Sequence, residues 1–416
     1  MIVRIVQLLK KDVMCFFMAN ILISVSTMIV NILLPKILPI EVFTDFIYIF
    51  QMVFFLTTVF QIGLVVSLYH FIERDRQRTL NIYYLSVGSL MLLLFMFAFW
   101  PNNPLLLAVN LNSMSRNQQI TFFASLIASE IFLYNKGKNI ADKDYRYMMK
   151  ISVIAFILRM IGLAVIGLAN ITNTSLILAV VFIIPFAQDI RDFAVNSIRY
   201  IHLRLVSGNL LRQIFVYSFK VWIISALFTI SDRLFLISTK GLDVSFTTAL
   251  AFSSGFVGII SLFNSCFTNY FISSLSTTRM EEIPRHIGRL IKLAPLYILI
   301  LLVVCGLASG SISLIYPDMG MMAPVLAFII LLRTGLISYF GMFSLLTKVL
   351  NMLNIEIILN VCRVLWTAAL CYLWQPENIL IWFVTITFLI LLPELLLTII
   401  IIKRVNIQTK QLDSIQ

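Results

Sequence analysis

The chain has 416 residues, of which 60% are hydrophobic and 12% are charged, and its mean hydropathy is +0.99. Soluble globular domains contain about half apolar and about a quarter charged residues, so this composition excludes an ordinary soluble domain and indicates an integral membrane protein. The formal net charge of +12 comes from lysines and arginines dispersed between the apolar runs, which favours membrane lipid over nucleic acid as a partner.

Twelve apolar runs are candidates for membrane-spanning helices, each of which needs about 20 residues. The fourth and sixth runs are the shortest. We therefore predict an all-α membrane protein with twelve transmembrane helices. The runs lie at residues 13–34, 46–69, 82–100, 120–134, 151–168, 175–188, 221–239, 246–272, 293–314, 324–346, 357–373 and 379–402.

The basic residues between these runs are distributed unequally. The side that holds both termini carries 24 lysines and arginines, whereas the other side carries only Lys36, Arg116 and Lys240. Lys and Arg are retained on the cytoplasmic side of short loops. The asymmetry predicts a multi-pass protein with both termini in the cytoplasm.

The longest cytoplasmic connection, at about residues 189–220, has six predicted spans on each side. We therefore predict an N-terminal lobe at residues 1–200 and a C-terminal lobe at residues 201–416. Both halves open with a basic amphipathic segment that leads into a span. Parallel repeats of this kind place a substrate site between the lobes, near the middle of the bilayer.

Four arginines lie inside predicted spans: Arg159, Arg233, Arg333 and Arg363. A charged side chain at the centre of a membrane helix costs about 2.5 kcal/mol or more, so it faces protein, water or a ligand. The guanidinium fork suits phosphate oxygens, which favours an anionic substrate in a central cavity. The structural alternative is that Arg233 pairs with Asp232, and Arg363 with Glu356, to hold helices together.

Polar residues also recur at helical spacing within the spans. Asn20 and Asn31 share one such face, and Asn360 lies on another between Glu356 and Arg363. Such faces serve either helix packing or a hydrated cavity. We take the three asparagines, together with the four arginines, as candidate substrate-binding residues. Candidate carboxylates for coupling to protons, sodium or membrane potential are Asp232, Glu130 and Glu356.

Several motifs are absent from the sequence. No glycine-rich phosphate loop with a lysine occurs, and the three histidines form no metal-binding pattern. The five cysteines all lie in predicted spans without a paired motif, so we expect neither a cofactor nor a metal. Glu41 and Asp45, in the first outer loop, keep a membrane glycosyltransferase or polymerase open as an alternative.

The segment at residues 31–74, NILLPKILPIEVFTDFIYIFQMVFFLTTVFQIGLVVSLYHFIER, resembles the opening of polysaccharide exporters. The similarity is to the multidrug/oligosaccharidyl-lipid/polysaccharide (MOP) superfamily, and most closely to Wzx-type O-antigen flippases. The second lobe of that family begins with an acidic-basic pair, and Asp232-Arg233 resembles it. Around Glu41 the chain lacks the glycines of the family. The other matching positions are Pro35, Tyr48, Phe50 and Gly63.

The resemblance implies two six-helix lobes around a central cationic cavity, as in MATE transporters, and a protein of the bacterial inner membrane. It implies a flippase that moves an undecaprenyl-pyrophosphate-linked oligosaccharide from the inner to the outer leaflet by alternating access. Polysaccharide polymerase machinery is a partner that the resemblance suggests. A multidrug exporter of the same superfamily is the main alternative. A major-facilitator sugar transporter is disfavoured because residues 70–78, HFIERDRQR, lack the glycine-rich signature of that family.

Overall fold

The chain is described here from a computed structural model. Its described residues form helices joined by short loops, and they contain no β-strand, which confirms the predicted all-α fold class. The residues that the structure describes are 2–72, 75–202, 208–239, 244–258, 260, 283–316, 321–349, 352–374 and 377–413.

Two compact units make up the chain: unit 1 is Met1–Thr229 and unit 2 is Ile230–Gln416. One helix, α10 (Gly208–Thr239), begins in unit 1 and ends in unit 2. The lobe boundary that we placed between residues 200 and 201 stays a prediction.

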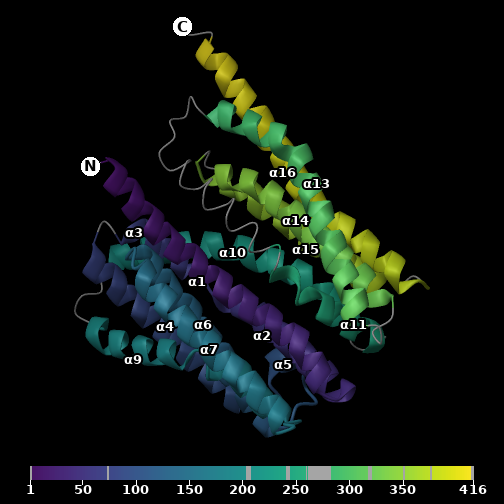
Figure 1. Ribbon diagram of the computed structural model, residues 1–416. Helices are drawn as coiled ribbons and strands as arrows, with labels where there is room; N and C mark the ends of the chain where they lie inside the picture. Colours follow the sequence, from purple (N-terminus) through teal and green to yellow (C-terminus); the bar gives the residue numbers. More distant parts are fainter. Residues whose placement is uncertain are drawn as a thin grey trace. The chain divides into compact units, whose positions relative to one another are not determined.

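In unit 1, the helix α6 lies at the centre and packs against α2, α4, α9 and the π-helix η1, while α1 packs along α7 (Figure 1). The elements of this unit are α1 (Ile2–Ile37), α2 (Ile40–Phe60), α3 (Leu64–Phe71), α4 (Arg76–Phe99), α5 (Pro104–Ala108), α6 (Arg116–Ala141), α7 (Tyr145–Leu168), α8 (Thr174–Leu178), η1 (Ala179–Ile183), α9 (Ala187–Tyr200) and the first part of α10.

In unit 2, the helix α14 has the central position and packs against α11, α13 and α16. Phe235, in the last part of α10, makes ring contacts with Trp382 and Phe383 of α16 at centroid distances of 4.9 and 5.2 Å. The remaining elements are α11 (Val244–Ser254), α13 (Ile283–Ile315), α14 (Met322–Val349), α15 (Leu353–Leu373) and α16 (Ile379–Asp413).

Polar residues at the loops define where several helices begin. Ser115 and Gln118 form a reciprocal capping box at the start of α6, where each side chain bonds the backbone amide of the other. Asp144 caps α7 by accepting from the amide of Tyr147, and Asp75 caps α4 in the same way. These caps satisfy amide groups that have no partner inside a helix.

Nine helices in the described part of the chain are long and apolar enough to cross a membrane. Of the other three expected spans, 120–134 lies within the more polar α6, and 175–188 is divided among α8, η1 and α9. Only the beginning of 246–272 is described, as α11, and residues 261–272 lie outside the described residues. The two shortest runs are therefore the ones that differ most from a plain apolar helix.

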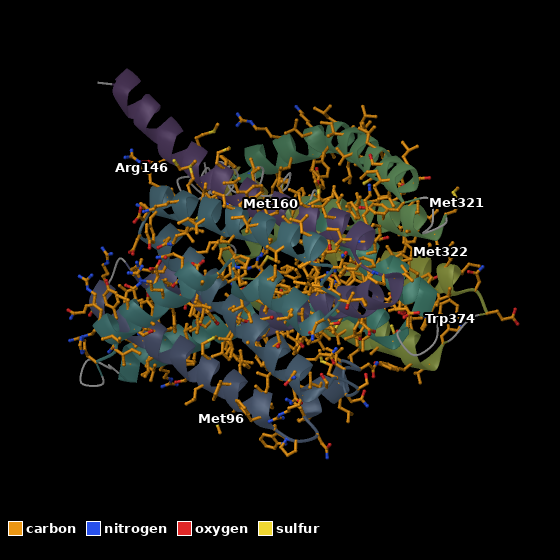
Figure 2. All side chains as sticks on the ribbon, turned by 60° about the horizontal axis from the view of Figure 1, so that its bottom comes forward. Met96, Arg146, Met160, Met321, Met322 and Trp374 are labelled. Atoms are coloured by element: carbon orange, nitrogen blue, oxygen red, sulfur yellow. The ribbon has the colours of Figure 1, made fainter. Side chains whose placement is uncertain are left out.

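Many apolar side chains point outward, as expected for helices that face lipid. Figure 2 shows Met96, Met322 and Trp374 projecting from the helices, and these residues are 60%, 38% and 40% exposed. Many other large apolar side chains are exposed as well, which is uncommon in a soluble protein. The exposed surface thus agrees with the composition in indicating a multi-pass membrane protein.

The second expected span, 46–69, is broken in the structure into α2 and α3. Gly63 lies between them with φ +61°, a left-handed conformation that favours glycine. The break leaves backbone carbonyls without helical partners, and the indole Nε1 of Trp222 donates to the carbonyl of Val59 at 2.5 Å. A side chain at position 63 would clash with the backbone carbonyl of Ser218. This part of α10 therefore fits against the break only because residue 63 has no side chain.

We expect Gly63→Ala to lower the free energy of unfolding by about 2–4 kcal/mol, because the methyl group meets backbone and the left-handed conformation becomes strained. Gly88→Ala in α4 is the matched control, since a methyl group there would have no atom within 4 Å. The control is expected to keep or slightly raise stability. Thermal unfolding of both variants in detergent checks this, and equal melting temperatures would contradict the packing of α10 against Gly63.

Candidate functional site: buried arginines

Unit 2 contains a cluster of three charged side chains, which we call the Asp232 cluster: Asp232, Arg233 and Arg333. Asp232 pairs with the guanidinium of Arg333, from α14, through one carboxylate oxygen. Its other oxygen lies 3.5 Å from Nε of Arg233. The side chains are only 9–19% exposed. One carboxylate therefore faces two guanidinium groups, which leaves the cluster with an excess positive charge.

A small cavity adjoins the Asp232 cluster. Its volume is about 20 Å³, which is room for one or two water molecules. Ser254 supplies a hydroxyl to the wall, and Phe235 and Phe383 supply aromatic rings. Nε of Arg333 is buried and has no hydrogen-bond partner among the described residues. The site therefore combines excess positive charge with a donor that is still available.

Arg363 lies in a second group of polar residues in unit 2. Its guanidinium donates to Glu394 Oε1 at 2.6 Å and to Asn360 Oδ1 at 2.8 Å, and Arg363 is 1% exposed. Asn360 in turn donates to the backbone carbonyl of Glu356 at 2.9 Å. Arg363 belongs to α15, and the carboxylate that pairs with it, Glu394, belongs to α16. This geometry favours a role in joining α15 to α16.

Arg159 is the buried arginine of unit 1, at 4% exposure. Its NH1 donates to Ser26 Oγ at 2.7 Å, and its Nε donates to the backbone carbonyl of Val181 at 3.1 Å. Its guanidinium also lies 5.3 Å from the ring centre of Phe186. No ion pair to Arg159 occurs within the described ranges. Neutral groups and an aromatic ring therefore hold this charge.

The carbonyl of Val181 is available to Arg159 for a local reason. In an α-helix it would accept from the amide of residue 185, but that residue is Pro185, which has no N–H. The chain instead forms the π-helix η1, in which the amide of Ile184 donates to the carbonyl of Ala179 at 3.0 Å. Single π-helical turns are frequent at functional sites. The proline therefore prepares an acceptor for the arginine.

The other predicted site residues are more dispersed. Asn20 donates to the carbonyl of Phe16 within its own helix, and Asn31 is buried in α1. Glu130 is fully buried in α6, and neither of its carboxyl oxygens has a hydrogen-bond partner among the described residues. Glu356 is 8% exposed at the start of α15. The structure thus unites Asp232, Arg233 and Arg333, and separately Arg363 with Asn360.

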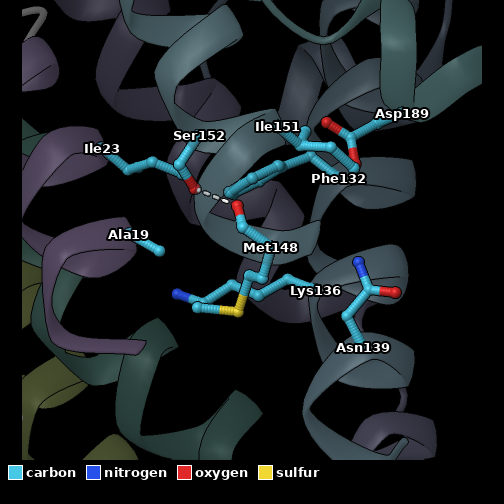
Figure 3. Close-up of a pocket in the computed structure, with 9 residues that line it drawn as sticks. All are labelled: Ala19, Ile23, Phe132, Lys136, Asn139, Met148, Ile151, Ser152 and Asp189. Carbon is cyan, nitrogen blue, oxygen red and sulfur yellow. Dashed lines mark hydrogen bonds between the residues drawn. The ribbon is translucent and has the colours of Figure 1, made fainter. Parts of the chain in front are cut away.

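Three polar features were missed in the sequence. The pairing of Arg333 with Asp232 joins distant helices, and sequence spacing carries no signal for it. Ser26, which accepts from Arg159, lies in α1 between the candidate residues Asn20 and Asn31, but it was not among the candidates. The third feature is a small cavity in unit 1, of about 10 Å³, which Lys136, Asn139 and Asp189 line (Figure 3).

Figure 3 shows the Lys136 amine and the Asp189 carboxylate on different sides of this cavity. Asp189 lies in the first turn of α9 and is 2% exposed. Asn135 donates to its backbone carbonyl at 2.6 Å and approaches its Oδ1 at 3.4 Å, while its Oδ2 has no hydrogen-bond partner among the described residues. Burial raises the pKa of Asp189 to about 7. The carboxyl group therefore holds a proton in acidic solution when the chain is folded.

We expect Asp189→Asn to change how stability depends on pH. The unfolded carboxyl loses its proton near pH 3.8, whereas the folded one holds it to about pH 7, so the stability that this group contributes decreases across that window as pH rises. Asparagine does not titrate, so the stability of the variant does not decrease in this way as pH rises. Its melting temperature relative to wild type should therefore rise between about pH 5 and about pH 8. A constant difference would contradict a protonated Asp189.

We also expect the pair of Arg363 and Glu394 to be structural. Glu394→Leu leaves a buried guanidinium without its carboxylate and should lower the free energy of unfolding by about 3–5 kcal/mol. The double variant Arg363→Leu/Glu394→Leu removes both charges and should be more stable than the single variant. Thermal unfolding in detergent measures both. A double variant less stable than Glu394→Leu would contradict this assignment.

Comparison with known proteins connects this architecture to one group of transporters. The chain matches no protein-family model, and no curated protein is significantly similar to it in sequence. Among solved structures it resembles a MATE protein in complex with MaL6, with a TM-score of 0.66, 13% identity and 95% of each chain covered. It also resembles an outward-facing multidrug resistance MATE family transporter of the MOP superfamily, with a TM-score of 0.60, 14% identity, and 98% of this chain and 97% of that one covered.

A third similar structure is a MOP superfamily transporter from Pyrococcus furiosus, with a TM-score of 0.59 and 14% identity over 95% of this chain and 96% of that one. The likeness covers nearly the whole chain in all three cases. At these identities the comparison concerns the fold alone. The chain therefore has the fold of the MATE transporters of the MOP superfamily.

Proposed function

We propose that the chain is a flippase that moves an undecaprenyl-pyrophosphate-linked oligosaccharide from the inner to the outer leaflet of a bacterial inner membrane, by alternating access. The observation that carries this proposal is the excess positive charge of the Asp232 cluster. Two arginines there share one carboxylate, and all three side chains are largely buried.

Pyrophosphate is the chemical group that such a cluster suits best. A guanidinium presents donors in a rigid fork that matches phosphate oxygens. Arg333 keeps one buried donor without a partner among the described residues, so an incoming oxygen need not first break an existing bond. Serine and asparagine side chains are the natural partners of sugar hydroxyls. The lipid tail of the substrate would remain in the bilayer.

The small volume of the cavity bears on mechanism. About 20 Å³ admits water but not a pyrophosphate group, so the substrate reaches these arginines only after the helices around them separate. Alternating access requires such a change between two states. The buried ion pair of Asp232 and Arg333 would then be the closed state of the site, in which the carboxylate takes the place of the substrate anion.

A multidrug exporter is the second candidate, because solved relatives of this fold include a multidrug resistance transporter. Cationic drugs would favour acidic or aromatic groups in a site, and the cavity has two aromatic rings, Phe235 and Phe383. The excess of arginine over carboxylate in the cluster nevertheless opposes a cation. The Pyrococcus furiosus relative is described by a binding pocket of reversed polarity that suggests a different function. Pockets of either polarity are therefore compatible with this fold.

A leaflet-resolved flipping assay tests the proposal. Purified chain in liposomes would be given a pyrophosphate-linked lipid oligosaccharide or, in parallel, a lipophilic cationic dye. We expect wild type to flip the lipid, and Arg333→Gln to slow flipping about tenfold or more, because it loses charged hydrogen bonds of about 1.5–3 kcal/mol. Asp232→Asn should keep flipping, since it removes the competing carboxylate and leaves both arginines in place.

The control is Glu41→Gln/Asp45→Asn, which removes two exposed carboxylates at the start of α2. An enzyme that uses these groups would lose activity in this variant, while a flippase that uses the arginines would not. Movement of the dye without the lipid would instead indicate a multidrug exporter. Unchanged flipping in a folded Arg333→Gln variant would contradict the proposed site.

A further inference from the structure

The helix α9 and the first part of α10 expose the same pattern of side chains. In each, a basic residue is followed at helical spacing by three apolar residues and a second basic residue, all on one exposed face. We call these faces the first and second stripes. The first consists of Arg191, Ala194, Val195, Ile198 and Arg199, and the second of Arg212, Phe215, Val216, Phe219 and Lys220.

The exposure of the apolar members is large. Ile198 is 83% exposed and Val195 is 58% exposed, while Phe219 and Val216 are about half exposed. No described element covers these faces. Exposed apolar side chains arranged in this way between two basic residues are typical of helices that lie in a membrane interface.

The inner face of α9 holds both acidic residues of the helix, which explains why every charged residue on the outer face is basic. Both acidic residues of this helix turn inward. Asp192 accepts from the hydroxyl of Tyr147 at 2.5 Å and from Gln188 at 3.0 Å, and Asp189 is buried against Asn135. Phe193 is buried as well, with its ring centre 5.6 Å from that of Tyr84. The inner face therefore anchors α9 to α4, α6 and α7.

The four basic side chains of the stripes make no ion pair with any carboxylate in the described parts of the chain. Arg199 lies over the ring of Tyr200, and this leaves its donors available. The charge of both stripes is thus exposed and is not neutralised by any carboxylate of the described residues.

The length of α10 places the second stripe near a membrane surface. Its 32 residues extend about 48 Å, whereas the hydrocarbon core of a bilayer is about 30 Å thick. The excess of about twelve residues matches the part that precedes Val221 and carries the second stripe. Both stripes also belong to the connection that the distribution of Lys and Arg predicts to be cytoplasmic.

We infer that the two stripes bind the anionic phospholipid surface of the cytoplasmic leaflet. The apolar side chains enter the boundary between headgroups and acyl chains, and the arginines and the lysine contact lipid phosphates. The connection between the two halves of the chain is thereby held in the plane of the membrane. This interaction is separate from substrate transport and does not depend on the proposed function.

Hydrogen exchange measured by mass spectrometry tests this inference on the full chain. The protein would be placed in nanodiscs of phosphatidylcholine alone, or of phosphatidylcholine with phosphatidylglycerol. Two variants each remove the two positive charges of one stripe and keep its apolar residues. They are Arg191→Gln/Arg199→Gln and Arg212→Gln/Lys220→Gln. The matched control is Lys403→Gln/Arg404→Gln, which removes the same charge from exposed positions of α16.

We expect phosphatidylglycerol to slow exchange in residues 187–200 and 208–220 of the wild type, by about fivefold for each basic contact. Each stripe variant should lose this effect in its own helix, and the control should keep it in both. Equal wild-type exchange in the two lipids would overturn the inference and favour a soluble protein as the partner. An effect that persists in the stripe variants, or that the control also abolishes, would overturn it as well.

Discussion

The high cost of a charge in an apolar environment governs the interior of this protein. Each buried arginine must find partners where water is scarce. The structure meets this requirement in three ways: Arg363 has a full ion pair, Arg333 shares its carboxylate with a second arginine, and Arg159 uses neutral groups and a ring. The three solutions differ in how much charge is left for a ligand. This difference, more than the number of arginines, separates structural residues from candidate binding residues.

The sequence was sufficient for the fold class because span length and hydropathy follow from the thickness of the bilayer. It was also sufficient to identify the buried arginines as unusual. It was not sufficient to identify partners, because Asp232 meets Arg333, and Arg363 meets Glu394, across helices that are far apart along the chain. The break at Gly63 was likewise hidden within a run of apolar residues of normal length.

The fold and the charge of the site carry different information. A likeness of the whole chain to MATE transporters comes with sequence identities near 13%, so the backbone arrangement is retained while almost every side chain differs. Substrate choice depends on those side chains. Two arginines against one carboxylate in unit 2 are thus a more specific property of this chain than its all-helical membrane fold, and the proposed preference for an anionic lipid rests on them.

Pro185 illustrates how a residue can shape a group of polar contacts through a hydrogen bond that it does not make. By lacking an amide hydrogen it leaves the carbonyl of Val181 unclaimed, and Arg159 takes that place. A replacement with an amide hydrogen would offer the carbonyl a competing donor only four residues away along the same helix. The hydrogen bond that holds Arg159 therefore depends partly on a backbone donor that Pro185 lacks. A comparison of polar side chains alone would overlook this.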